Sequence, residues 1–266
     1  MHQLMIDLHN VEAPTRDSPG DSHVHLGPGV SSARRTNPAV NLYGLPRIDV
    51  VLLSYYHGDH FDQKVESSLR RNLPITTTPH AKSILTSKGG DFFTKVYDLE
   101  PFQQATVYIP GNTSRKKGRM RVTGVLGKHA PTRVIDNLNN LVSALGFDGE
   151  GPTSDFTVRH HIYISGDTLM VHDLNEIPKR YANQKINLML THLGGTTVPS
   201  SALGPLAMRV TMDAKQGVQL MQLIRPDVTI PIHYYDYDVF PRSLEDFRKQ
   251  VEEAGLSSDV VYLDRG

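Results

Sequence analysis

Short apolar runs, each closed by a polar or glycine-rich turn, recur along most of the chain. The first, Ile48–Ser54 (IDVVLLS), is β-branched or leucine at most positions, which predicts a strand buried on both faces. Similar runs predict further strands over residues 74–78, 95–99, 103–111, 118–127, 155–167, 186–195, 227–234 and 259–263. This density of strands predicts at least two sheets.

Apolar residues four positions apart predict helices between some of these strands. Val65, Leu69 and Leu73 fall on one helix face in the segment 61–73. Capping and stop residues support three more helices, over 79–89, 213–225 and 243–255. The alternation of strands with helices indicates an α/β protein with two sheets and helices outside them.

Residues 15–46 are rich in Pro, Gly, Ser and Asn and show no period, which predicts a long irregular loop. Loops of this length are uncommon unless they serve a site. Residues 1–266 are expected to form a single domain, in which residues 1–46 supply a partial N-terminal strand and this loop.

Composition narrows the class of protein. Lys+Arg and Asp+Glu both number 28, so no overall basic charge points to nucleic acid, and the basic cluster near 115–121 is expected in a hairpin loop. No signal peptide and no apolar run of the ~18–20 residues that span a bilayer are expected. The chain has no cysteine, so a metal would be held by its 13 histidines and its carboxylates, and a cytoplasmic location is expected.

Several strand-like runs end in a residue type that binds metals. These residues are His57, Asp59 and His60 after the run 50–54, His129 after 121–128, Asp167 after 161–166, and His233 after 228–232. Strand ends hold side chains rigidly while leaving them facing a crevice. One such histidine is usually a packing residue, but four strand ends of this kind predict a metal site.

These motifs resemble the metallo-β-lactamase superfamily. Its first motif, His-x-His-x-Asp-His after a buried strand, corresponds to YYHGDH at residues 55–60, and the resemblance extends over about residues 26–240. The branch it resembles most contains the L-ascorbate-6-phosphate lactonase and the N-acylphosphatidylethanolamine phospholipase D. The resemblance implies a four-layer αββα sandwich, here expected to lack its first N-terminal strands.

The resemblance also implies the site. A first metal would be held by His57 and His129, a second by Asp59, His60 and His233, and Asp167 would bridge them. Zinc is the expected metal, as one or two ions, with iron or manganese as alternatives. A metal-bound hydroxide would attack an ester, lactone, amide or phosphodiester, with lactones slightly favoured, and Asp59 would also act as general base or acid. A small-molecule substrate follows from this chemistry.

Tyr55 departs from the motif, because it stands where the family has its first histidine. A phenol with a pKa near ~10 is a poor zinc ligand, so Tyr55 is at most a possible metal or near-metal residue. Three hypotheses follow: a hydrolase with one or two metals, a binding protein whose site is inactive, and an iron-dependent oxidoreductase, since phenolate binds iron.

Two further residues are pocket candidates. His192 follows another strand-like run and precedes Gly194 and Gly195, where the backbone can approach a ligand closely. Tyr234 follows His233 and would form part of an apolar wall. Structural packing explains either residue equally well.

Overall fold

The computed structural model describes residues 4–6, 11–12, 23–27, 30–33, 35, 40–41, 44–54, 56–87, 89–109, 118–128, 140–147, 158–198, 208–235, 237–238 and 244–264. Of the helices in these ranges, none has the length and apolar character needed to cross a membrane.

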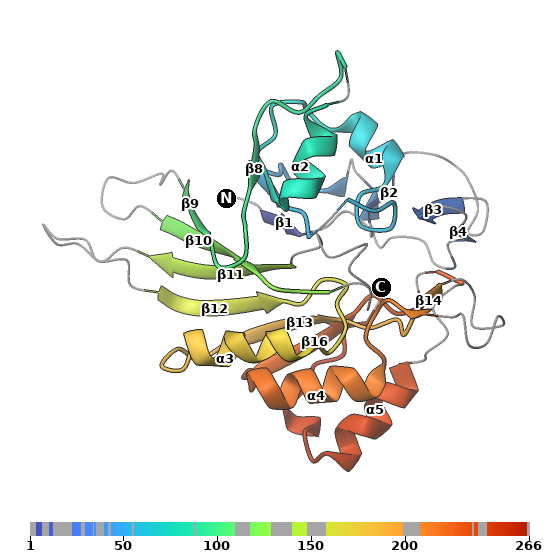
Figure 1. The fold of residues 1–266 in the computed structure, drawn as a ribbon, viewed down its shortest axis with the longest axis vertical. Helices are drawn as coiled ribbons and strands as arrows, with labels where there is room; N and C mark the ends of the chain where they lie inside the picture. The colour runs from blue at the N-terminus through green and yellow to red at the C-terminus, as the bar shows by residue number, and fades with distance from the viewer. Residues whose placement is uncertain are drawn as a thin grey trace, which may run out of the picture.

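Two main sheets organise the chain (Figure 1). The smaller sheet is parallel throughout and has the order β1 (Leu4–Ile6), β6 (Val50–Leu52), β7 (Ile75–Thr77), β8 (Val96–Asp98). The larger sheet has the order β16 (Val228–Ile232), β13 (Leu188–His192), β12 (Val158–Ile164), β11 (Asn140–Phe147), β10 (Gly118–Val125), β9 (Gln104–Ile109). Strands β9 to β12 form an antiparallel meander, while β12, β13 and β16 are parallel.

Three small pairings complete the described strands. They are β2 (Val11–Glu12) with β5 (Val40–Asn41), β3 (His23–Gly27) with β4 (Val30–Ala33), and β14 (Thr197–Val198) with β15 (Met208–Arg209).

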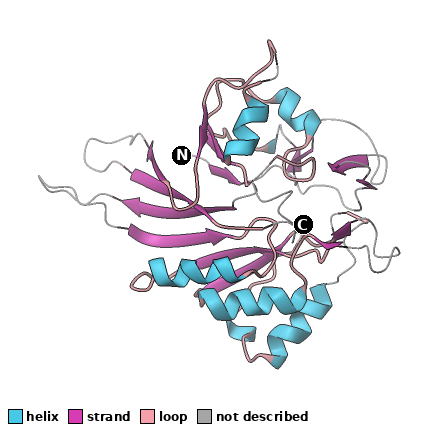
Figure 2. Cartoon of the chain, in the orientation of Figure 1, coloured by secondary structure: helices cyan, strands magenta, loops and turns pink. Residues whose placement is uncertain are grey.

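The helices lie on the outer faces of the two sheets. They are α1 (Gln63–Ser68), α2 (Pro79–Leu85), α3 (Glu176–Arg180), α4 (Ala214–Ile224) and α5 (Leu244–Glu253), with short 3₁₀ helices at His172–Asn175 and Ser257–Asp259. Helices α1 and α2 flank the smaller sheet, and α3, α4 and α5 flank the larger one (Figures 1 and 2). The result is the four-layer αββα sandwich expected from the sequence.

Strand β6 shows why the layers form. All residues from Val50 to Leu53 are buried, and alternate side chains of a strand point to opposite faces. Leu52 belongs to the apolar cluster between the sheets, together with Met120 of β10. Leu53 belongs to the cluster under α1 and α2, together with Leu85. A strand apolar at every position therefore fills two cores at once.

Helix α4 begins and ends where its sequence predicts. The Asp213 side chain accepts a hydrogen bond from the Gln216 N–H at 2.9 Å, which satisfies one of the free amides of the first turn. Arg225 adopts a left-handed conformation with φ 53°, and Pro226 follows it. The buried face of α4 packs in the same core as α3, α5 and β13.

Most predicted elements are confirmed, three expectations are wrong, and two elements were not predicted. Residues 15–46 contain β3, β4 and β5 and are not one irregular loop. The helix predicted over 61–73 ends at Ser68, although Leu73 is still buried. Residues 259–263 form only an isolated bridge from Val260 to Thr229. The sequence NLVSALGF does not alternate apolar with polar residues, so β11 was not predicted, and neither was α3.

The strand directions bring the predicted chemistry to one edge. Strands β12, β13 and β16 run parallel, so the segments that follow them leave the larger sheet on the same side. Asp167 follows β12, His192 is the last residue of β13, and His233 follows β16, so all three residues lie at that edge.

Candidate metal centre

Four buried side chains converge at this edge. Asp59, His60, Asp167 and His233 each offer one nitrogen or oxygen atom, and these atoms all lie within 4.8 Å of one another. Asp59 and His60 follow β6 of the smaller sheet, while Asp167 and His233 follow strands of the larger sheet. The cluster therefore joins the two sheets.

Imidazoles and carboxylates alternate around the cluster. Asp59 Oδ2 lies 3.9 Å from His60 Nε2 and 3.5 Å from His233 Nε2. Asp167 Oδ2 lies 3.4 Å from His60 Nε2, and Asp167 Oδ1 lies 3.6 Å from His233 Nδ1. These separations are those of a set of ligands around a common centre, longer than ordinary charge-assisted hydrogen bonds of about 2.7–2.9 Å.

A tight turn places Asp59 and His60. The amides of His60 and Phe61 both donate to the His57 carbonyl, at 3.1 and 2.7 Å. The Phe61 ring is fully buried and lies with its centroid 6.2 Å from that of Phe93. Burial of such a ring contributes roughly 1.5–3 kcal/mol, so the core beneath the smaller sheet anchors this turn.

A second turn places Asp167. Gly166 has φ 55°, in the left-handed region that favours glycine, directly before the aspartate. Thr168 Oγ1 accepts a hydrogen bond from the Lys128 amide at 2.9 Å, and the Leu169 amide donates to the Lys128 carbonyl. The segment after β10 is therefore tied to the turn that carries Asp167.

His233 adopts a strained backbone conformation. Its φ is 62°, which costs a non-glycine residue on the order of 1–2 kcal/mol. Strand β16 ends at Ile232, and the left-handed turn at His233 directs the chain away from the sheet. Gly194 lies beside it, since a Cβ there would be 3.4 Å from the His233 carbonyl oxygen. Strain of this kind is concentrated at functional sites.

The charges of the cluster act on one another. Burial alone would raise the pKa of Asp59, but His60 and His233 outweigh it and hold that pKa well below its usual value. Burial alone would lower the pKa of His233, but Asp167 and Asp59 outweigh it and raise that pKa. The carboxylates of Asp59 and Asp167 in this position attract a cation, whether a proton on imidazole or a metal ion.

His192 packs against both cluster histidines. Its ring is stacked on that of His60 at a centroid distance of 5.7 Å, and its centroid lies 5.5 Å from that of His233. The Ser165 hydroxyl donates to the Gly166 carbonyl and accepts from the His192 backbone amide, both at 2.9 Å. Its oxygen also lies 3.4 Å from His192 Nδ1, which assigns the ring proton to Nδ1.

Ser54 has the same relationship to His60. Its hydroxyl oxygen lies 3.3 Å from His60 Nδ1, while His60 Nε2 faces the carboxylates of Asp59 and Asp167. Partners on the outer ring nitrogen fix the orientation of a metal-binding histidine and its proton. Sequence reasoning missed Ser54 and Ser165, because serine at the end of a strand carries no signal of its own.

The donor set fits a divalent metal. Two imidazole nitrogens and two carboxylates match the ligands of zinc, and iron and manganese accept the same set. Asp59 Oδ1 is buried and has no hydrogen-bond partner among the described residues, an arrangement that is costly in the absence of a cation.

The other predicted site residues have different positions. His57 is half-buried and does not belong to the four-residue group formed by the described residues. Tyr55 and His129 lie outside the described residues. Tyr234 is buried, and its ring packs edge-on against Tyr235 at 5.5 Å.

Comparison with known proteins gives consistent results. The model of a family described as the beta-lactamase superfamily domain matches residues 22–234. A UPF0173 metal-dependent hydrolase from Archaeoglobus fulgidus is 29% identical over 83% of this chain and 80% of its own length. A protein of the same description from Methanosarcina mazei is 26% identical over 82% and 79%.

Solved structures share the fold. An isothiocyanate hydrolase from Delia radicum gut bacteria superposes with a TM-score of 0.66 at 14% identity, covering 99% of this chain and 90% of that one. A possible metal-dependent hydrolase from Veillonella parvula has a TM-score of 0.62 at 18% identity, with coverage of 98% and 90%.

Proposed function

Because this chain belongs to the beta-lactamase superfamily, we propose that Asp59, His60, Asp167 and His233 form the metal centre of a hydrolase that cleaves an ester, lactone, amide or phosphodiester. Metal-dependent hydrolysis is the activity in the names of the curated relatives, and this chain is a metal-dependent hydrolase of the same superfamily. The observation that carries the proposal is the convergence of these four buried side chains from two sheets.

We assign zinc as the metal, held by His60, His233 and the two carboxylates. His57 and His129 are the proposed ligands of the first metal expected from the motif, for which Tyr55 replaces the family's first histidine. A bound zinc ion supplies a Lewis acid that polarises the scissile group and lowers the pKa of a water molecule towards ~7.

The protein side chains have separate tasks. Asp59 is kept ionised at neutral pH by its low pKa, so its carboxylate can accept a hydrogen bond from the attacking water and orient it. Asp167 contacts both cluster histidines and so holds the two halves of the site together. Ser54 orients the ring of His60 through Nδ1, the ring nitrogen that faces away from the carboxylates. Because the cluster is buried, these interactions act in a medium of low dielectric, where they are stronger than in water.

The substrate class follows from the resemblance of the motifs. The sequence from Tyr55 to His60, with His129, Asp167 and His233 following in order, supports the branch that contains the L-ascorbate-6-phosphate lactonase. Lactones are therefore the favoured substrates. A cytoplasmic location is proposed because a chain without cysteine has no disulfides of the kind used in oxidising compartments.

Hydrolysis assays test the proposal. Purified protein is stripped with a chelator, reloaded with zinc, manganese or iron, and assayed with lactones, aryl esters, amides and phosphodiesters. Zinc is expected to restore turnover of at least one class, with lactones fastest, and Asp167→Asn is expected to abolish it. Hydrolysis that persists without metal, or iron-dependent oxidation without hydrolysis, contradicts the proposal.

A further inference from the structure

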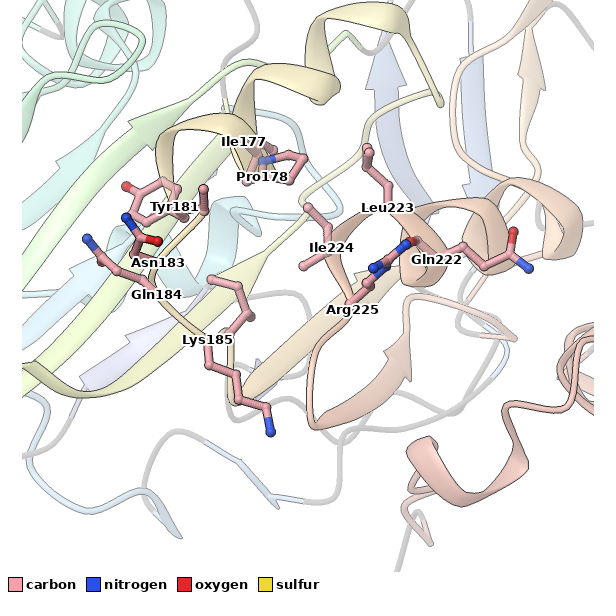
Figure 3. A pocket seen from close by; sticks show the side chains of 12 residues that line it. Ile177, Pro178, Tyr181, Asn183, Gln184, Lys185, Gln222, Leu223, Ile224 and Arg225 are labelled. Carbon is pink, nitrogen blue, oxygen red and sulfur yellow. The ribbon is translucent and has the colours of Figure 1, made fainter.

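Two hollows that share Tyr181 adjoin the segment between α3 and β13, at the opposite end of β13 from the metal cluster. The larger, of about 650 Å³, separates Ile177 and Tyr181 from Leu223 and Arg225 at the end of α4 (Figure 3). The smaller, of about 270 Å³, shares Tyr181 with it but lies over the larger sheet. We name the smaller hollow the His161 pocket, after the residue in the middle of β12 that lines it.

Two arginines line the His161 pocket. They are Arg121 of β10 and Arg180 at the end of α3, and the described residues of the lining include no acidic side chain. The guanidinium carbon of Arg180 lies 3.9 Å from the centroid of the Phe102 ring, so the ring holds the planar group in place. Two guanidinium groups around a concave surface favour an oxyanion, because each can form paired hydrogen bonds with it.

His161 supplies an independent indication of a ligand. It is only 8% exposed, and its Nδ1 donates to the Lys185 carbonyl at 3.0 Å. This contact places the proton of the neutral ring on Nδ1 and the lone pair on Nε2. Nε2 is buried and receives no hydrogen bond from any described residue. An unmatched buried acceptor is costly, so a group that donates to Nε2 is expected in the pocket.

The sheet holds His161 in this orientation. Its backbone amide donates to Asn187 Oδ1 at 3.0 Å, and its carbonyl accepts from the Asn187 amide. The Tyr181 ring lies edge-on to the imidazole at 6.4 Å. His160, the preceding residue, is exposed on the opposite face of β12, as expected for a strand. The position of Nε2 is therefore fixed before any ligand binds.

We propose that the His161 pocket binds a small oxyanion that also carries a hydroxyl group. The oxyanion contacts Arg180 and Arg121, and the hydroxyl donates to His161 Nε2. Phosphate monoanion and short hydroxy acids share this chemistry. A volume of about 270 Å³ lies just below the ~300–1,000 Å³ typical of pockets for larger ligands, which favours a ligand of this size. The proposal does not depend on the proposed hydrolase function.

Histidine side-chain NMR of the full-length, metal-loaded protein tests the proposal. The probes are inorganic phosphate, lactate, and propionate, which matches lactate except for the hydroxyl. Phosphate, lactate or both are expected to give a saturable shift of His161, and lactate is expected to bind at least about tenfold more tightly than propionate. If only phosphate or only lactate shifts His161, the probe that responds identifies the ligand as a phosphate or as a hydroxy acid. The proposal is overturned if neither phosphate nor lactate gives a saturable shift of His161 up to about 10 mM, or if lactate binds and propionate binds with equal affinity.

Variants of two arginines separate specific binding in the pocket from general electrostatic attraction to the protein. Arg180→Gln is expected to weaken binding of the active probe about tenfold or more. Arg225→Gln removes the same charge from the neighbouring hollow and is expected to leave the affinity unchanged. Arg180→Lys keeps the charge without the planar group, so its affinity for the active probe should fall between those of wild type and Arg180→Gln. This variant still tests the proposal if Arg180→Gln folds poorly. Equal weakening by the Arg180 and Arg225 variants overturns the proposal.

Discussion

His233 Nε2 lies 3.5 Å from Asp59 Oδ2, and both side chains are buried. Asp59 follows β6 of the smaller sheet and His233 follows β16 of the larger one. The contact therefore depends on the packing of the two sheets against each other, and also on the two turns that carry Asp59 and His233. Any cation held between these two atoms would stabilise the joined edges of the sandwich.

Acidification should weaken metal binding. A metal ion and a proton compete for His233, whose pKa is raised by the nearby carboxylates against the effect of burial. The affinity should therefore begin to fall at a pH above the ordinary histidine value of ~6.5, by about tenfold per pH unit for each proton displaced. Chelator competition between about pH 5 and 8 measures this.

The metal-free protein should show the opposite trend. A raised folded-state pKa contributes stability that is present below ~6.5 and lost as the pH rises through the folded value. The free energy of unfolding contributed by His233 in the metal-free protein should therefore decline on going from acid to neutral pH, as urea titrations would detect. A metal affinity that does not change with pH would contradict the first expectation, and an unfolding free energy of the metal-free protein that does not decline over this range would contradict the second.

Ser54→Ala should reduce metal affinity without unfolding the protein. The variant removes the oxygen 3.3 Å from His60 Nδ1, and loss of such a partner typically lowers metal affinity by about 10- to 100-fold. Ser83→Ala is the matched control, because the Ser83 hydroxyl donates to the His80 carbonyl within α2. Equal affinities of the Ser54 variant and the control in a metal titration would show that Ser54 does not orient His60.

Tyr55→His should complete the first metal site. The substitution restores the family's first histidine beside His57, so about one additional metal ion per chain is expected, with faster hydrolysis. Elemental analysis and the assay of the best substrate measure these together. A variant with unchanged metal content would show that Tyr55 does not determine how many metal ions the chain binds.

Gly124→Ala should destabilise the fold away from the site. A Cβ at this position of β10 would lie 2.7 Å from the Glu100 carbonyl oxygen and 3.2 Å from Leu99 Cβ. Overpacking against backbone typically costs about 1–3 kcal/mol of unfolding free energy. Gly90→Ala is the control, since a Cβ there meets nothing within 4 Å. Urea denaturation giving the two variants equal stability would contradict the packing described here.

The layers of the fold could be predicted because their signals are local. The run around Val50–Leu53 is apolar at every position, and Asp213 and Pro226 mark the start and the end of α4. Strand β11 could not be predicted, since its pairing with β10 and β12 is non-local and its sequence lacks alternation. The short strands within residues 15–46 were missed for the same reason.

The candidate site was predictable in part. Asp59, His60, Asp167 and His233 follow strands that end at the same edge, and their residue types already indicated metal chemistry. The stacking of His192 on His60 depends on how β13 lies beside β12 and could not be read from its neighbours in sequence. The strain at His233 also became visible only in the folded chain.

The metal content of purified protein after gel filtration tests the presence of the metal centre most directly. Wild type is expected to retain at least about one zinc ion per chain, and His60→Ala less than about a tenth of that, because the variant loses an imidazole ligand. His160→Ala, which removes an exposed histidine from β12, should match wild type. Wild-type protein without metal, or His60→Ala protein with the wild-type content, would contradict a metal centre at this cluster.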